Sequence, residues 1–99
     1  MTVYTIARIT IEDRDEYAKY EAGFMDIFQK YDGTLLSVDE APEVLEGEWS
    51  ATRSVLISFP TKQAMKDWYN SEEYQALAKH RFAASIGEVL VVAGLDGVS

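Results

Sequence analysis

Arg53 is the first residue of this chain whose type and position could do chemistry. It begins a segment rich in β-branched residues, on the same side as Val55 and Ile57. An arginine among apolar side chains is costly to bury without an acidic partner, and Glu46 in the preceding segment is a candidate for that partner. The planar guanidinium of Arg53 is also suited to hold the carboxylate or phenolate of a substrate. The residues therefore leave a structural ion pair and a ligand anchor open as alternatives.

Three aromatic residues near the expected strand ends are candidates for a small-molecule pocket. Trp49, Trp68 and Tyr69 could line an apolar cavity with a few polar groups, which is the usual form of such a site. Trp68 stands at helical spacing from Met65, which favours a packing role as the anchor of its helix. Tyr69 is the stronger pocket candidate, because its hydroxyl group needs a partner or a ligand.

Two further polar residues fall on the inward faces of expected helices. Tyr20 follows Tyr17 by about one turn, and these hydroxyl groups either project into the cleft between helix and sheet or simply pack. Arg81 lies on the inner face of the last helix, where it adds a second cation. The candidate ligand-binding residues are therefore Tyr20, Glu46, Trp49, Arg53, Tyr69 and Arg81.

The sequence contains few residues that could coordinate a metal ion. It contains one histidine and no cysteine, which excludes a multi-histidine cage or a thiolate site within one chain. His80 lies beside Leu77 on the last helix and is expected at the surface. The acids between Asp39 and Glu48 match no calcium-loop spacing and are expected to form a solvated loop. No metal and no cofactor are therefore expected.

Strand and helix patterns alternate along the chain. Strands are expected at Tyr4–Ile11, Thr34–Val38, Thr52–Phe59 and Glu88–Ala93. Helices are expected to begin after three N-terminal caps, which are Asp13, Thr61 and Ser71. The first helix carries an apolar stripe from Tyr17 to Tyr31. The pair Asp32-Gly33 is expected to end it, because glycine tolerates a left-handed cap.

This order, β-α-β-β-α-β with a second helical segment in two parts, is the ferredoxin-like arrangement of the α+β class. It predicts a four-stranded antiparallel sheet with both helical segments on one face. A chain of 99 residues is too short to bury a second core, so a single domain is expected over residues 1–99.

The face of the sheet that the helices leave free is expected to be apolar as well. In the strand alternation, Ile6, Leu56, Leu90 and Val92 lie on this second face. A sheet with one wet face would alternate apolar and polar residues more cleanly. We expect a second copy of the chain to cover the face, which gives a homodimer with two sheets packed against each other.

The charge balance excludes several partners. Asp and Glu number 17 against 9 Lys and Arg, which gives a net charge of -8. No basic stripe is present, so neither nucleic acid nor an anionic membrane surface is an expected partner. The sequence shows no signal peptide and no apolar run that could span a bilayer. The cytoplasm is therefore the expected location.

Several segments together resemble one bacterial family. They are Leu45–Trp49, Arg53–Pro60, Trp68–Gln75 and Arg81, supported by Tyr17, Tyr20 and Gly33. The most distinctive part is the Trp-Tyr-x-Ser-x-x-Tyr stretch that begins at Trp68. The similarity covers nearly the whole chain, and the family is known as domain of unknown function thirteen-thirty, within the dimeric α/β-barrel superfamily. The resemblance implies a ferredoxin-like fold and a dimer, and it implies no established activity.

The wider superfamily includes cofactor-free monooxygenases, haem-degrading monooxygenases and lactone isomerases, and a fold does not choose among them. Haem-degrading relatives place a histidine on a comparable helix and an asparagine on the first strand, where this chain has Arg8 and Thr10. The leading hypothesis is a homodimer that binds a small, partly apolar or anionic ligand near Arg53, Tyr69 and Arg81. The alternatives are a cofactor-independent monooxygenase or isomerase acting on a small aromatic or quinol-type substrate, and a dimeric interaction module without catalysis.

Overall fold

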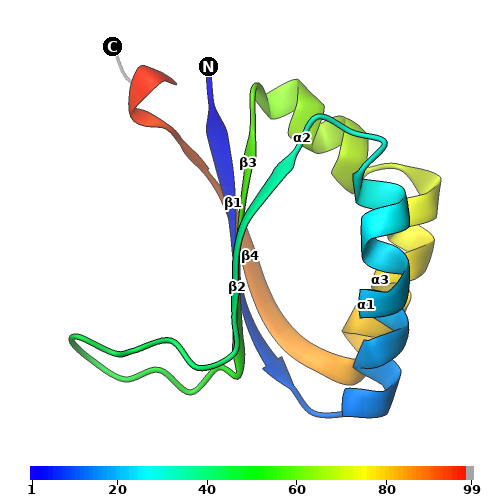
Figure 1. The fold of residues 1–99 in the computed structure, drawn as a ribbon, viewed down its shortest axis with the longest axis vertical. Helices are drawn as coiled ribbons and strands as arrows, with labels where there is room; N and C mark the ends of the chain where they lie inside the picture. Colours follow the sequence, from blue (N-terminus) through cyan, green and yellow to red (C-terminus); the bar gives the residue numbers. More distant parts are fainter. Residues whose placement is uncertain (98–99) are drawn as a thin grey trace.

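The computed structural model describes residues 1–97, which form a sheet with helices on one side (Figure 1). The elements follow one another as β1 (Val3–Ile11), α1 (Arg14–Phe28), β2 (Thr34–Asp39), β3 (Arg53–Phe59), α2 (Lys62–Tyr69), α3 (Glu72–Ala84), β4 (Ser85–Ala93) and the 3-10 helix η1 (Leu95–Gly97). This order confirms the predicted arrangement, with the second helical segment divided into α2 and α3.

The strands form one antiparallel sheet in the order β2-β3-β1-β4. β1 and β3 lie in the middle, and β2 and β4 are the edges. The helices pack over one side of the sheet, with α1 against α3, and leave the opposite side bare (Figure 1). The ferredoxin-like α+β fold expected from the sequence is therefore confirmed.

The predicted N-terminal caps are confirmed as well. The side-chain oxygens of Asp13, Thr61 and Ser71 each accept a hydrogen bond from the backbone N–H three residues later, at 3.1, 3.0 and 3.2 Å. Each cap satisfies one N–H group that the start of a helix leaves without a partner inside the helix. The caps fix where α1, α2 and α3 begin, and so which side chains face the sheet.

Within residues 1–97, no helix combines the length and the hydropathy that crossing a bilayer requires.

The end of α1 differs from the expectation. The helix ends at Phe28, so Tyr31 lies beyond it, and Gly33 does not adopt the left-handed backbone conformation. Gly33 provides space instead, because a Cβ atom there would lie 2.5 Å from Cζ of Phe28 and 2.6 Å from Cε1 of Phe59. The predicted left-handed cap is therefore wrong, and the glycine serves a close approach of two rings.

The last strand begins earlier than the sequence predicted. β4 starts at Ser85, directly after α3, and Ile86 and Gly87 already pair with β1. A glycine weakens the strand pattern, so composition alone placed the start at Glu88. Pairing with the long central strand β1 decides the true boundary.

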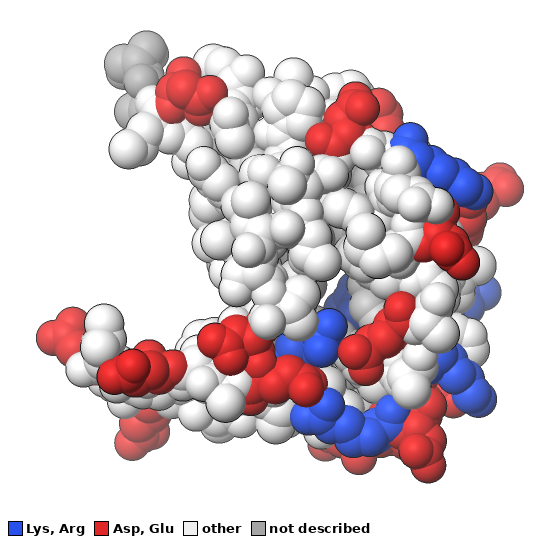
Figure 2. Space-filling model, viewed as in Figure 1, with Lys and Arg blue, Asp and Glu red and all other residues white. Residues whose placement is uncertain are grey.

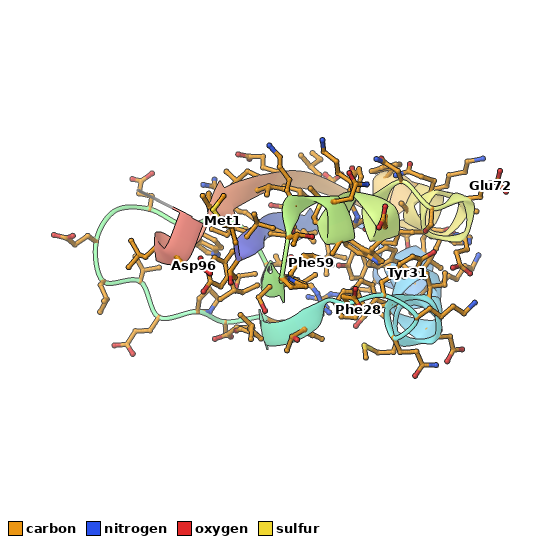
Figure 3. The ribbon with its side chains drawn as sticks, turned by 90° about the horizontal axis from the view of Figure 1, so that it is seen from above. Met1, Phe28, Tyr31, Phe59, Glu72 and Asp96 are labelled. Carbon is orange, nitrogen blue, oxygen red and sulfur yellow. The ribbon has the colours of Figure 1, made fainter. Side chains whose placement is uncertain are left out.

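Aromatic rings fill the layer between the helices and the sheet. The ring centroids of Phe28 and Phe59 lie 6.1 Å apart, and each lies 5.5 Å from the centroid of Trp68. Figure 3 places Phe28 and Phe59 next to each other between α1 and β3. Trp68 is buried, which agrees with its expected role as the anchor of α2. The core therefore ties the helix layer to the centre of the sheet.

The side of the sheet away from the helices, called the outer face below, is apolar. Ile6 pairs with Leu56 on β3 and with Leu90 on β4, and Ile6, Leu90 and Val92 are 40%, 51% and 37% exposed. Residues 40–52, called the arm below, extend from the sheet on this side. Figure 2 shows acidic side chains on the arm and a largely uncharged surface beside it. The expected apolar second face is therefore confirmed.

Replacing Gly33 by Ala tests the close approach of the two phenylalanine rings. The added methyl group would overlap both rings, so we expect the free energy of unfolding in urea to fall by about 1–3 kcal/mol. Gly87→Ala is the matched control, because its Cβ atom would meet its nearest neighbour at 3.5 Å, an ordinary contact. Equal stability of the two variants would contradict this account of Gly33.

Candidate functional site

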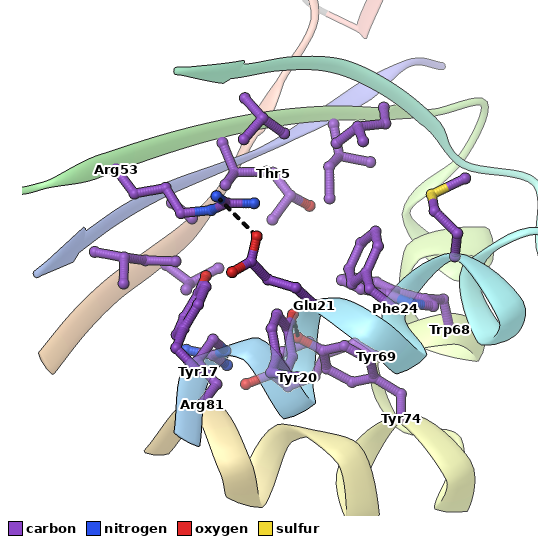
Figure 4. A pocket seen from close by; sticks show the side chains of 18 residues that line it. Thr5, Tyr17, Tyr20, Glu21, Phe24, Arg53, Trp68, Tyr69, Tyr74 and Arg81 are labelled. Atoms are coloured by element: carbon purple, nitrogen blue, oxygen red, sulfur yellow. Dashed lines mark hydrogen bonds and ion pairs between the residues drawn. The ribbon is translucent and has the colours of Figure 1, made fainter. Parts of the chain in front are cut away.

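A cavity lies between the helix layer and the sheet. Its volume is about 180 Å³, and every strand and α-helix contributes at least one lining residue. Thr5 and Arg53 lie on its sheet side, and Tyr20, Tyr74 and Arg81 lie on its helix side (Figure 4). Four exposed lining residues on α1 and β2 mark an opening between these elements, and they are Glu21, Met25, Leu35 and Val38.

Arg81 is a buried cation with no acid beside it. The residue is 5% exposed, and within residues 1–97 no carboxylate lies at ion-pair distance from it. Its guanidinium carbon lies 5.8 Å from the ring centroid of Tyr20 and 4.8 Å from that of Phe82. Burial acts to lower the pKa of Arg81, but the nearby Tyr74 and Tyr20 outweigh it and raise that pKa above its usual value. The side chain therefore remains charged at the cavity wall.

Tyrosine hydroxyl groups stand beside this cation. The Oη atoms of Tyr20 and Tyr74 are 2.8 Å apart, so one hydroxyl donates to the other. Burial raises the pKa of Tyr20 far above its usual value, and Tyr74 adds to the effect. Burial also raises the pKa of Tyr17, although Arg53 and Arg81 act in the opposite direction. Tyr17 and Tyr20 are therefore neutral at physiological pH and cannot serve as bases.

Arg53 reaches the cavity from the sheet, and its partners are not the predicted one. Its Nη1 atom lies 3.4 Å from a carboxylate oxygen of Glu21 and 3.4 Å from one of Glu40. Its guanidinium carbon lies 5.5 Å from the ring centroid of Tyr17. The expected pairing with Glu46 is wrong, because no ion pair joins these two described residues. The pairing of β2 with β3 brings Glu40 back to Arg53, whereas the arm carries Glu46 away.

Three residues that line the cavity carry buried polar atoms without a hydrogen-bond partner in residues 1–97. The atoms are Thr5 Oγ1, Arg53 Nε and Trp68 Nε1. Both nitrogen atoms can only donate, and the hydroxyl of Thr5 can donate as well. Buried polar groups in proteins are almost always satisfied, so these atoms call for acceptors that the described residues do not supply. Thr5 was missed from the sequence, although its alternation with Val3 and Ala7 on the buried side of β1 could have revealed it.

The cavity brings together only part of the set of residues predicted from the sequence. Its lining includes Tyr20, Arg53, Tyr69 and Arg81. Glu46 and Trp49 lie in the arm instead, where they line a separate hollow, and the guanidinium carbon of Arg8 lies 5.2 Å from the ring centroid of Trp49. Glu21 and Tyr74 are lining residues that the sequence argument did not include.

The histidine lies apart from the cavity lining. His80 is half-buried, and its Nδ1 atom forms a hydrogen bond with a carboxylate oxygen of Glu16 on α1. Hydrogen bonds from His80 and Lys19 hold the pKa of Glu16 below its usual value. In the part of the chain that the structure describes, no group of three or more His, Cys, Asp or Glu side chains could hold a metal ion. The histidine therefore joins α1 to α3.

Comparison with known proteins gives the family. The profile described as "Domain of unknown function (DUF1330)" matches residues 2–95. The chain belongs to the DUF1330 family. The resemblance identified from the sequence is thereby confirmed, and no activity comes with it. No curated protein matches this DUF1330 chain.

Solved structures share the fold of this DUF1330 chain. A protein of unknown function from Rhodopseudomonas palustris, RPA0582, has a TM-score of 0.79 at 16% identity, over 95% of this chain and 82% of that one. SnoaB, a cofactor-independent oxygenase from Streptomyces nogalater, has a TM-score of 0.68 at 15% identity, over 98% and 96%. A dimeric ferredoxin-like protein of unknown function from Jannaschia sp. CCS1 has a TM-score of 0.69 at 14% identity, over 95% and 100%. At these identities, the likeness shows the fold alone.

Replacing Arg81 by Met tests whether the cation is kept for a purpose other than stability. Methionine fills similar space without a charge to desolvate, so we expect the free energy of unfolding in urea to stay unchanged or rise by about 1 kcal/mol. Arg53→Met is the matched control, and its lost contacts with Glu21 and Glu40 should lower that energy by up to about 1 kcal/mol. A loss above about 3 kcal/mol in Arg81→Met would identify a structural role instead.

Proposed function

We propose that this DUF1330 protein binds a small, partly apolar anion in the cavity between its helices and its sheet. The observation that carries the proposal is the set of buried donors on Thr5, Arg53 and Trp68, which have no partner in residues 1–97. Arg81 adds a positive charge that no carboxylate in the same range neutralises. An anionic group in the cavity would give Arg81 a counter-charge, and its oxygen atoms could accept hydrogen bonds from donors in the wall.

The size and the apolar walls of the cavity narrow the ligand further. Its volume of about 180 Å³ is close to that of a roughly 150 Å³ cavity known to hold one benzene ring. The walls include the side chains of Phe24, Ile57 and Trp68. A single-ring aromatic carboxylate therefore fits the size, the apolar surface and the charge. We place Tyr20, Arg53, Tyr69 and Arg81 in the binding set and leave out Glu46 and Trp49.

The similarity to an oxygenase raises catalysis as the alternative. Oxygenase or isomerase chemistry without a cofactor needs a group that takes a proton from the substrate. Among the described lining residues, Glu21 is the one carboxylate, and it lies beside Arg53. The wall is thus richer in donors than in bases, which favours binding over proton abstraction. Uptake of dissolved oxygen with hydroquinone as the probe would establish the catalytic alternative instead.

We propose also that two copies of the chain assemble through their outer faces. Ile6, Leu56, Leu90 and Val92 form an apolar surface that is characteristic of an interface. The similar protein from Jannaschia is described as dimeric. A second copy offers the same apolar face, which is the self-complementarity that two-fold symmetry requires. If the chain assembles but binds no ligand, the alternative of a dimeric interaction module without catalysis is favoured. The cytoplasmic location remains a prediction from the sequence.

Ligand binding is tested with benzoate as the probe and benzyl alcohol as its neutral counterpart. We expect benzoate to raise the Tm, because binding at about 100 times Kd stabilises the fold by about 2.7 kcal/mol, and benzyl alcohol to have little effect. Arg81→Met should weaken benzoate binding about 10- to 100-fold in calorimetry. Lys79→Met, which removes an exposed cation from the same helix, should leave the affinity unchanged. Benzoate binding that survives Arg81→Met would contradict the proposed role of the cation, as would a panel of single-ring anions that all fail to bind.

The assembly is tested by light scattering on the unmodified chain. We expect a mass of twice 11.1 kDa. Ile6→Asp places a carboxylate in the middle of the outer face, so it should give the monomer mass. Ala76→Asp, on the exposed side of α3, is the control and should remain a dimer. A monomeric wild-type protein at tens of micromolar concentration would remove this proposal.

A further inference from the structure

We propose that the arm of each protomer reaches around the edge of its partner, so that Leu45 at the arm tip packs against the partner's Leu95. The inference rests on the homodimer proposed above and goes beyond it. It assigns a second contact outside the outer face, and it fixes the direction of the two-fold axis.

The arm and η1 stand at opposite ends of the outer face. The arm leads into β3 at Arg53, which pairs with Ile9 near the end of β1. η1 follows Ala93, which pairs with Val3 at the beginning of β1. Figure 1 shows both segments projecting from the sheet on the side away from the helices. The outer face is therefore the floor of a trough with a raised segment at each end.

Both raised segments hold a leucine out in solvent. Leu45 is 88% exposed and Leu95 is 92% exposed, the two highest values among the large hydrophobic residues in the described part of the chain. The root of the arm is nevertheless fixed, because the backbone N–H of Thr52 donates to the carbonyl oxygen of Ile9 at 2.9 Å. The arm thus presents an apolar side chain to solvent from a root that is held to the sheet.

The arm also has room for an apolar group from outside. A hollow on the arm is lined by residues that include Val44, Leu45 and Trp49. The Nε1 atom of Trp49 is buried and has no acceptor in residues 1–97. An incoming segment would supply a backbone carbonyl to that donor and an apolar side chain to the hollow. The segment around the partner's Leu95 offers both.

Charge decides which ends of the two protomers meet. With the two-fold axis along the strands, the two arms would lie side by side; with the axis across the strands, each arm meets the partner's η1. Residues 40–52 contain no Lys or Arg, and the carboxylates of Glu43, Glu46 and Glu48 have no ion pair within residues 1–97. Adjacent arms would bring two such sets together, whereas η1 carries one acid, Asp96, which already accepts hydrogen bonds from Thr2. Repulsion therefore favours the axis across the strands (Figure 2).

Cysteine cross-linking tests this contact, because the natural chain contains no cysteine. The variant Leu45→Cys/Leu95→Cys is treated with a short bis-maleimide, and denaturing gels with peptide mapping report the product. We expect a covalent dimer linked between positions 45 and 95. Leu45→Cys alone and Leu95→Cys alone should stay uncoupled, since each cysteine faces a leucine of the other protomer. Leu45→Cys/Ala76→Cys is the matched control and should also stay uncoupled, because residue 76 lies on the helix layer.

The other outcomes overturn the inference in separate ways. A covalent dimer from Leu45→Cys alone would show that the arms lie side by side, and one from Leu95→Cys alone would show that the two η1 segments meet. Dimers by light scattering without any cross-link would show that the arm tip does not reach the partner's η1, while the homodimer itself stands. A monomer in light scattering for wild type and double variant alike would remove the homodimer, and this contact with it.

Discussion

The sheet has two apolar faces, but the single layer of helices covers only one of them, and the other main features of the molecule follow from this constraint. Every residue of the edge strand β2 remains exposed. On the inner side, the strip that stays uncovered becomes the opening of the cavity between α1 and β2. On the outer side, it leaves an apolar surface with Ile6 and Leu90 exposed. The proposed ligand binding on the inner face and the proposed assembly on the outer face therefore have the same cause, which is that the helices leave apolar parts of the sheet uncovered.

The composition of the inner layer supports the proposed binding in the cavity. A layer that only joined helices to a sheet would pack as well with apolar side chains, which need no hydrogen-bond partners. Here Thr5, Arg53 and Trp68 keep buried donors without acceptors in residues 1–97, and Arg81 keeps a charge without an acid. Each of these features costs the free protein stability. Such costs are common where a site needs the groups, which supports the proposed binding in this cavity.

Sequence reasoning succeeded where neighbours along the chain decide the outcome. Strand alternation placed Arg53 on the helix side, and the caps gave the helix starts, because both depend on residues a few positions apart. Inward positions converge on one space, which is why Tyr20, Tyr69 and Arg81 meet Arg53 at the cavity. The acidic partner of Arg53 was beyond reach, because strand pairing brings in Glu40 while the arm, whose direction no local rule sets, carries its other glutamates away. The close approach of the Phe28 and Phe59 rings at Gly33 could not be predicted either, because Phe59 lies far from Gly33 along the chain.

Glu40 joins the arm to the helix side of the sheet. It is the first residue of the arm, and its carboxylate lies 2.6 Å from Nη1 of Arg14 and 3.4 Å from Nη1 of Arg53. The start of the arm is thereby tied to α1 and to the sheet side of the cavity. Arg53 shares its positive charge with Glu21 and Glu40, whereas Arg81 has no carboxylate beside it within residues 1–97. Of the two cations, Arg81 is therefore the one that would attract an anion in the cavity more strongly.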